Sequence, residues 1–121
     1  MRAIIDSDVL IDYLQGLNTA KLELDRYPKR EMSIVSWMEI MAGADSPEEA
    51  KACQGFLNSF TIHQLSIEVA SEAVKIRKEF RIRLPDAVVW ATARSQGCLL
   101  VTRNTKDFPA SEPDIRIPYG V

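Results

Sequence analysis

Short apolar runs typical of β-strands alternate along this chain with segments whose apolar residues recur at helical spacing. The strand-like runs are residues 2–5, 32–36, 60–65, 98–102 and 114–118. The helical patterns cover residues 7–17, 19–26, 36–42, 46–60, 66–80 and 85–96. Parallel strands need long crossovers, and helices usually supply them. This order therefore predicts an α/β fold, a three-layer sandwich in which helices flank a mostly parallel sheet of four to five strands.

The length of 121 residues predicts a single domain over 1–121, large enough to bury a real core. No apolar run approaches the roughly 20 residues of a membrane span, and acids interrupt the apolar N-terminal segment. We therefore expect a cytoplasmic protein without a leader or a membrane anchor. Cys53 and Cys98 are expected to be reduced. The single histidine, His63, argues against a zinc site and against Ser-His-Asp chemistry.

The net charge of −2 argues against a broad electrostatic grip on nucleic acid. A nucleic-acid substrate would have to be held by a local basic patch or through a bound metal ion. Arg103 and Lys106 lie beside an acidic loop and are the candidates for contact with phosphate groups. Asp12 is expected to be a solvated charge on the exposed face of its helix.

Four acidic residues end strand-like runs or lie in the first turn of a predicted helix: Asp6, Glu39, Asp86 and Asp107. The carboxyl ends of parallel strands converge on one crevice, so these side chains can meet there. Carboxylates that meet repel one another, and Mg²⁺ or Mn²⁺ is the usual reason to gather them. The pattern favours a metal-dependent phosphodiester hydrolase.

Each acid also has a purely structural interpretation. Asp6 could cap the following helix. Glu39 could close a capping box that begins at Ser36. Asp86 could simply pair with the positive end of a helix dipole, and the segment from Asn104 to Asp107 could be ordinary turn chemistry.

The chain resembles PIN-domain proteins, and among them the VapC-type toxins of bacterial and archaeal toxin–antitoxin pairs. The resemblance rests on "IIDSDVLIDYL", "SIVSWMEIMAG" and "LPDAVVWATARSQGCLLVTRNTKDF", and it covers nearly the whole chain. It implies a Mg²⁺- or Mn²⁺-dependent endoribonuclease, a hydrolase that cleaves RNA phosphodiester bonds with a metal-activated water. It also implies a homodimer, inhibition by a cognate antitoxin protein that covers the site, and an RNA substrate for which a tRNA is the first suggestion.

Three acids of the family motif match Asp6, Glu39 and Asp86. Asn104 stands where the family commonly has its fourth acid, and Asp107 follows three residues later. The resemblance therefore implies catalytic roles for Asp6, Glu39, Asp86, Asn104 and Asp107, with the four carboxylates as metal ligands. Whether Asn104 or Asp107 fills the fourth position stays open, as does the number of ions.

Two other functions remain compatible with the sequence. A phosphatase of the haloacid-dehalogenase type would use Asp6 as nucleophile and Asp8 as general acid, with Lys106 as its lysine. That class also needs a late acidic pair, which the sequence lacks. A non-catalytic RNA-binding module on the PIN-like fold is the second alternative, because Asn104 replaces an acid.

Overall fold

Five parallel strands form the centre of the protein, in the spatial order β3-β2-β1-β4-β5. The structure is a computed structural model and describes residues 1–120. The strands are β1 (Ala3–Ile5), β2 (Glu31–Ser33), β3 (Thr61–His63), β4 (Leu99–Val101) and β5 (Ile115–Arg116). The helices are α1 (Ser7–Leu14), α2 (Asn18–Leu24), α3 (Ile34–Ala42), α4 (Pro47–Leu57), α5 (Ile67–Phe80) and α6 (Leu84–Gln96). The predicted α/β sandwich is confirmed, and all the strand pairings are parallel.

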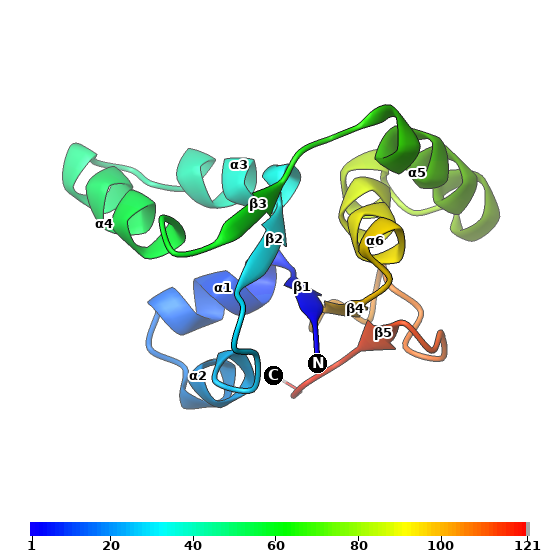
Figure 1. Ribbon diagram of the computed structural model, residues 1–121. Helices are drawn as coiled ribbons and strands as arrows, with labels where there is room; N and C mark the ends of the chain where they lie inside the picture. The colour runs from blue at the N-terminus through cyan, green and yellow to red at the C-terminus, as the bar shows by residue number, and fades with distance from the viewer. Residues whose placement is uncertain (121) are drawn as a thin grey trace.

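The central strand β1 separates two apolar cores because neighbouring side chains point to opposite faces of a sheet. Ile4 belongs to a core built with α5 and α6, around the buried Trp90. Ala3 and Ile5 belong to the other core, built with α1, α2 and parts of α3 and α4. Figure 1 shows these two helical layers on either side of the strands. Helix α3 contacts both α1 and α6, so it connects the layers.

The second strand lies earlier than the pattern at residues 32–36 predicts. Strand β2 ends at Ser33, and α3 begins at Ile34 with Ser33 as its N-cap. The Ser33 hydroxyl accepts a hydrogen bond from the amide of Val35 at 3.1 Å. The prediction was wrong because the run "MSIV" continues across the boundary, and only its second residue, Ser33, marks the start of the helix. Helix α4 also ends earlier than expected, at Leu57 rather than near Phe60.

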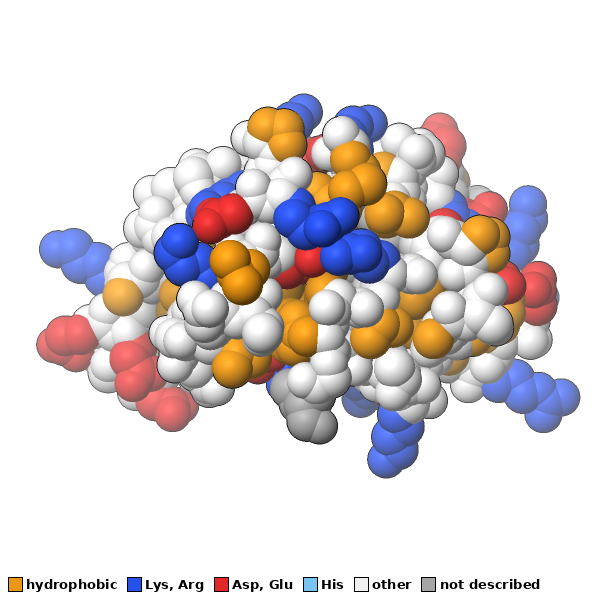
Figure 2. Space-filling view, turned by 90° about the horizontal axis from the view of Figure 1, so that it is seen from below, with side chains coloured by type: hydrophobic (Ala, Val, Ile, Leu, Met, Phe, Trp, Pro, Cys, Tyr) orange, Lys and Arg blue, Asp and Glu red, His pale blue; other side chains and the backbone are white. Residues whose placement is uncertain are grey.

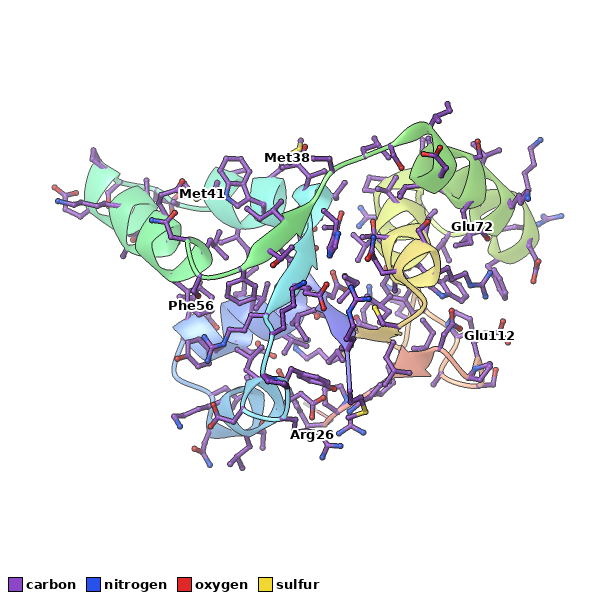
Figure 3. The ribbon with its side chains drawn as sticks, viewed as in Figure 1. Arg26, Met38, Met41, Phe56, Glu72 and Glu112 are labelled. Atoms are coloured by element: carbon purple, nitrogen blue, oxygen red, sulfur yellow. The ribbon has the colours of Figure 1, made fainter. Side chains whose placement is uncertain are left out.

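Helix α6 is buried along most of its length, as its nearly continuous apolar sequence predicts. Its Trp90 indole donates to Asp114 at 2.8 Å, and Arg94 donates to the same carboxylate at 2.9 Å. Arg94 also pairs with Glu72 of α5 and with Glu112 of the segment before β5, which lie on one side of the molecule in Figure 3. These contacts fasten the edge strand β5 to the α5–α6 layer.

Other predictions concern single residues. His63 contacts the buried Glu31 at 2.9 Å, and both cysteines are free thiols that are half-buried.

Within residues 1–120, no helix has the length and apolar character that a membrane crossing requires. The face seen from below in Figure 2 carries basic, acidic and apolar side chains side by side, which agrees with the small net charge.

Candidate carboxylate site

The register of β1 against β4 brings the first acid of the motif to its neighbours. Ile5 pairs with Val101, so the next residues, Asp6 and Thr102, leave adjacent strands side by side. The Thr102 hydroxyl donates to Asp6 Oδ2 at 2.8 Å, and the amide of Ser7 donates to Asp6 Oδ1 at 2.8 Å. Asp6 is thereby also the N-cap of α1. Its structural and its proposed functional role coexist at one position.

Asp6 is almost fully buried, and its recorded hydrogen bonds come from neutral donors. Burial raises the pKa of this carboxyl to about 8, and the nearby charge of Asp8 adds to the shift. The two hydrogen bonds oppose it, and Glu39 raises the pKa slightly further. The site therefore disfavours a negative charge on Asp6 unless something positive compensates for it.

Asp8 and Glu39 complete a cluster that we call the Asp6 group (Asp6, Asp8, Glu39). Asp8 accepts from the Thr102 hydroxyl at 3.2 Å and from the Arg103 amide at 3.3 Å. Burial raises its pKa. The Ser7 hydroxyl donates to Glu39 Oε1 at 3.0 Å, which connects α1 to α3.

The capping-box interpretation of Glu39 is wrong. Ser33 caps α3, whereas Ser36 lies inside the helix, where its buried hydroxyl has no hydrogen-bond partner within the described residues. Glu39 lies in the second turn and reaches Ser7 instead of an amide at the start of its own helix. The carboxylate thus points toward the carboxyl end of β1, as the positional argument predicts.

Asp86 and Asp107 form a second cluster, the Asp86 group. Asp86 lies in the first turn of α6, is buried and receives a long contact of 3.4 Å from Arg83. Burial raises its pKa, Arg83 opposes the shift and the charge of Asp107 adds to it. The two acids are named together because the charge of Asp107 acts on Asp86.

The loop after β4 connects the two groups. Thr102, which holds Asp6 and Asp8, also accepts from the Asn104 amide at 3.1 Å. The Asn104 side chain donates to Asp107 at 2.8 Å and accepts from the Asp107 amide at 3.2 Å. Asn104 therefore orients Asp107 in this structure, and the two residues act as one unit of the loop.

Asp12 is not the solvated charge that the helical pattern predicted. Its side chain is buried and accepts from Arg103 Nε at 2.6 Å, from Arg103 Nη2 at 3.2 Å and from the Tyr119 hydroxyl at 2.7 Å. Asp8 and Asp12 are four residues apart and face the β4 loop together. The loop and the C-terminal segment cover this side of α1, which helical periodicity alone does not reveal.

The donor set suits a hard divalent cation, because every candidate ligand is an oxygen. The burial and the mutual repulsion that raise the pKa values of Asp6 and Asp86 are features that a cation would relieve. Among residues 1–120, however, no three acidic, histidine or cysteine side chains are placed so that they could hold a metal ion together. An ion shared by the two groups would therefore require the side chains to move.

Glu39 lines two grooves. One, of about 430 Å³, lies between α1, α3 and α4 and is lined mainly by apolar residues such as Ile11, Leu14 and Ile40. The other, of about 360 Å³, lies between α3 and the start of α6 and is lined by Met38 and Leu84 among others. A larger depression of about 780 Å³ lies elsewhere, around Arg2 and Cys98 at the opposite ends of the strands.

Comparison with known proteins identifies the family. The PIN domain matches residues 3–110 of the chain. The chain belongs to the PIN-domain family. This PIN domain is 30% identical to Ribonuclease VapC10 of Mycobacterium tuberculosis (strain CDC 1551 / Oshkosh) over 126 residues, covering 98% of the chain and 93% of that protein. Ribonuclease VapC10 of strain ATCC 25618 / H37Rv matches with the same figures. The resemblance to VapC-type proteins is confirmed.

Solved structures agree with this assignment. A toxin–antitoxin complex from Klebsiella pneumoniae contains a chain that superimposes with a TM-score of 0.92 at 36% identity, covering 99% of this chain and 100% of that one. FitAcB from Neisseria gonorrhoeae gives a TM-score of 0.82 at 20% identity, with 97% and 98% coverage. The second likeness supports the PIN fold alone.

The sequence analysis did not place Asp8 and Asp12 in this site, because neither residue matches an acid of the PIN-domain motif. Asp8 joins the Asp6 group through Thr102, and Asp12 binds Arg103, so both belong to the structure around the site. The four-residue spacing of Asp8 and Asp12 was the available signal. Recognising it would have required knowing which face of α1 meets the β4 loop.

Proposed function

We propose that this PIN-domain protein is a Mg²⁺- or Mn²⁺-dependent endoribonuclease and the toxin of a toxin–antitoxin pair. The observation that carries the proposal is the clustering of the buried Asp6 with Asp8 and Glu39, beside Asp86 and Asp107, at the carboxyl ends of parallel strands. Relatives named as a ribonuclease and as toxin–antitoxin complexes support the same activity.

Asp6, Glu39, Asp86 and Asp107 would hold the ion. When bound, a divalent cation supplies a nucleophile at neutral pH and stabilises the charge that develops on the phosphate. Thr102 orients Asp6 by hydrogen bonding to one of its oxygens, and Ser7 orients Glu39. Asn104 orients Asp107 by donating a hydrogen bond to its carboxylate. Lys106, in the same loop, is exposed and is our candidate for contact with an RNA phosphate.

Asp6→Asn tests the proposal directly. The substitution keeps the size of the side chain and one of its two acceptor oxygens, replaces the other oxygen by an amide donor, and removes the charge that would bind the ion. We expect RNA cleavage in Mg²⁺ or Mn²⁺, and toxicity on expression, to fall below detection while the circular dichroism spectrum is unchanged. Asp25→Asn, at an exposed pair with Lys21, is the matched control and should cleave normally. Cleavage by Asp6→Asn at the wild-type rate would refute the assignment.

A non-catalytic RNA-binding module is the second candidate, because no three of the described acids are placed so that they could hold a metal ion together. It predicts RNA binding without cleavage in either metal ion. A labelled pool of total RNA, followed by purified tRNA, distinguishes the two candidates and begins to define the substrate.

An antitoxin protein is the proposed partner, supported by structural relatives that are toxin–antitoxin complexes. The apolar groove between α1, α3 and α4 is its proposed docking site, because this groove leads to Glu39 and an occupant would obstruct the carboxylates. Co-expression with the neighbouring gene product should abolish cleavage, and Leu14→Arg in the groove should restore it by weakening the complex.

We also propose a homodimer. Met38 projects outward from α3 in Figure 3 and is 56% exposed, although it is a large apolar side chain next to the second groove. Light scattering should give twice the chain mass for the wild type and the chain mass for Met38→Glu. A monomeric wild type at tens of micromolar would exclude a stable dimer.

A further inference from the structure

Two carboxylates of α1 accept hydrogen bonds from two consecutive residues, Thr102 and Arg103, at the beginning of the loop that follows β4. Asp8 accepts from the Thr102 hydroxyl and from the Arg103 amide, at 3.2 and 3.3 Å. One helical turn later, Asp12 accepts both Nε and Nη2 of the Arg103 guanidinium, at 2.6 and 3.2 Å. The Tyr119 hydroxyl, from the segment after β5, donates to Asp12 at 2.7 Å. Asp12 thus joins α1, the β4 loop and the C-terminal segment.

The arrangement differs from a surface ion pair. The Asp12 side chain is only 8% exposed, and two donors of the guanidinium converge on its carboxylate. A paired planar contact of this kind fixes orientation as well as distance, which a lysine would not do. These two Arg103 nitrogens are consequently engaged with the protein rather than presented to a substrate.

The residues that follow Arg103 belong to the proposed site. Asn104 donates its amide to Thr102 and its side chain to Asp107, and the same Thr102 hydroxyl donates to Asp6. A displacement of Arg103 would therefore move Asn104 and Asp107 relative to Asp6. We propose that Asp12, Arg103 and Tyr119 are positioning residues that hold the loop Thr102–Asp107 against α1 and fix the position of Asp107 in the candidate site. Their effect on cleavage rests on the proposed function, whereas their effect on the loop does not.

The chain contains a control with almost the same chemistry. Glu23 of α2 is buried and accepts Arg116 Nε at 2.7 Å, Arg116 Nη2 at 2.9 Å and the Tyr27 hydroxyl at 2.7 Å. Arg26, which also pairs with Glu23, lies at the lower end of the molecule in Figure 3, away from α3. This second network should cost similar stability when broken but should leave the β4 loop in place.

The first test is hydrogen–deuterium exchange on the metal-free protein, which does not depend on activity. Asp12→Asn should accelerate exchange of the amides of residues 103–108 relative to wild type. Glu23→Gln should leave those amides protected and accelerate exchange around α2 and β5. Equal protection of residues 103–108 in Asp12→Asn and Glu23→Gln would overturn the proposal. If Asp12→Asn does not fold, Tyr119→Phe removes one hydrogen bond from the same carboxylate and takes its place.

The second test is a double-mutant cycle on RNA cleavage. Asp12→Asn and Arg103→Gln should each lower kcat at least about tenfold with KM changed less than about twofold, and the double variant should be no worse than either single one. Glu23→Gln and Arg116→Gln should keep the wild-type kcat. A raised KM in Arg103→Gln, without a change in Asp12→Asn, would overturn the proposal in favour of phosphate binding by Arg103. If the wild type does not cleave RNA, the proposed function fails and the exchange test alone decides.

Discussion

Asp6 has two structural roles: it caps α1, and it accepts a hydrogen bond from the strand next to β1. One carboxylate oxygen caps α1 through the Ser7 amide, and the other accepts from Thr102. A cap needs an acceptor but not a charge, since serine and asparagine cap helices as well as aspartate does. Burial beside Asp8 and Glu39 makes the charge costly. The helix start alone therefore does not explain a carboxylate here, and the proposed cation would compensate its charge.

The pKa of Asp6 makes metal-free stability depend on pH in a defined direction. The folded protein holds this proton up to about pH 8, whereas the unfolded chain releases it near 3.8. Folding therefore takes up a proton between these values, and the free energy of unfolding falls as the pH rises, by at most about 1.4 kcal/mol per pH unit. Urea titrations in a chelator from pH 5 to 9 should show this fall for the wild type. In Asp6→Asn it should be reduced, and parallel curves would contradict the prediction.

The start of helix α3 is set by the serine whose hydroxyl accepts from an amide of the first turn. Ser33 caps the helix, whereas Ser36, one turn later, is buried with an unpaired hydroxyl within the described residues. Both serines are fully buried, so burial alone does not distinguish their effects. The difference lies in hydrogen bonding.

Alanine substitutions at the two serines should have unequal effects. Ser33→Ala should lower the free energy of unfolding by about 1 kcal/mol, because the Val35 amide loses its acceptor. Ser36→Ala should be neutral or stabilising, since an unpaired buried hydroxyl costs roughly 1–3 kcal/mol. Denaturant unfolding measures both. A larger loss in Ser36→Ala would restore the capping-box interpretation.

Strands β1, β2 and β3 are joined at a fully buried acid that no functional motif explains. Glu31 of β2 accepts two hydrogen bonds from Arg2, at 2.7 and 3.0 Å, and contacts His63 of β3 at 2.9 Å. The bonds from Arg2, with help from His63, hold the pKa of Glu31 at about 2 in spite of burial. Glu31 thus stabilises the sheet at the ends of the strands opposite the site.

Acid should remove this stabilisation. The unfolded pKa of Glu31 is 4.5 and the folded one is about 2, so the contribution is present above pH 4.5 and is lost as the pH falls through this interval. Relative to Glu31→Gln, the wild type should lose about 3 kcal/mol of unfolding free energy between pH 6 and 2. Urea unfolding of both proteins measures it, with the exposed Glu48→Gln as control. A constant difference between wild type and Glu31→Gln would contradict the prediction.

At the scale of the whole molecule, the site draws on both helical layers. The α1–α4 layer supplies Asp8 and Glu39, the α5–α6 layer supplies Asp86 (Figure 1), and the loop after β4 supplies Asp107. Repulsion among these acids opposes the final packing of the layers. A bound divalent cation should therefore stabilise the folded protein as a whole.

Thermal unfolding with and without Mg²⁺ or Mn²⁺ tests this stabilisation. A ligand at 100 times its Kd that binds only the folded state adds roughly 2.7 kcal/mol, which raises the Tm by several degrees in a domain of this size. Asp6→Asn should lose most of the shift, and Asp25→Asn should keep it. Equal shifts in wild type and Asp6→Asn would place the ion elsewhere.

Much of the fold was predictable because the signals are local. Helical spacing and the Pro47 and Gly97 signals determine which segments are helices, and short apolar runs mark the strands. The order of strands and helices along the chain was predicted correctly. The boundary between β2 and α3 was predicted wrongly, because a short apolar run is compatible with a buried strand and with the buried face of a helix.

The candidate site was predictable only in part. Asp6, Glu39, Asp86, Asn104 and Asp107 follow from strand ends and from the family motif, and their catalytic roles remain predictions. The burial of Asp12 and the orientation of Arg103 depend on segments more than 90 residues apart in the sequence.

The sequence by itself determined the α/β class, the PIN-domain family and the identity of the acids, because periodicity and motif spacing are properties of neighbouring residues. The tertiary structure alone decided how those acids are divided into two groups and which of them carry unfavourable charge. It also decided that Asp12 holds the loop rather than facing water. These features depend on strand register and on what covers each helix, and both arise only when distant segments pack together.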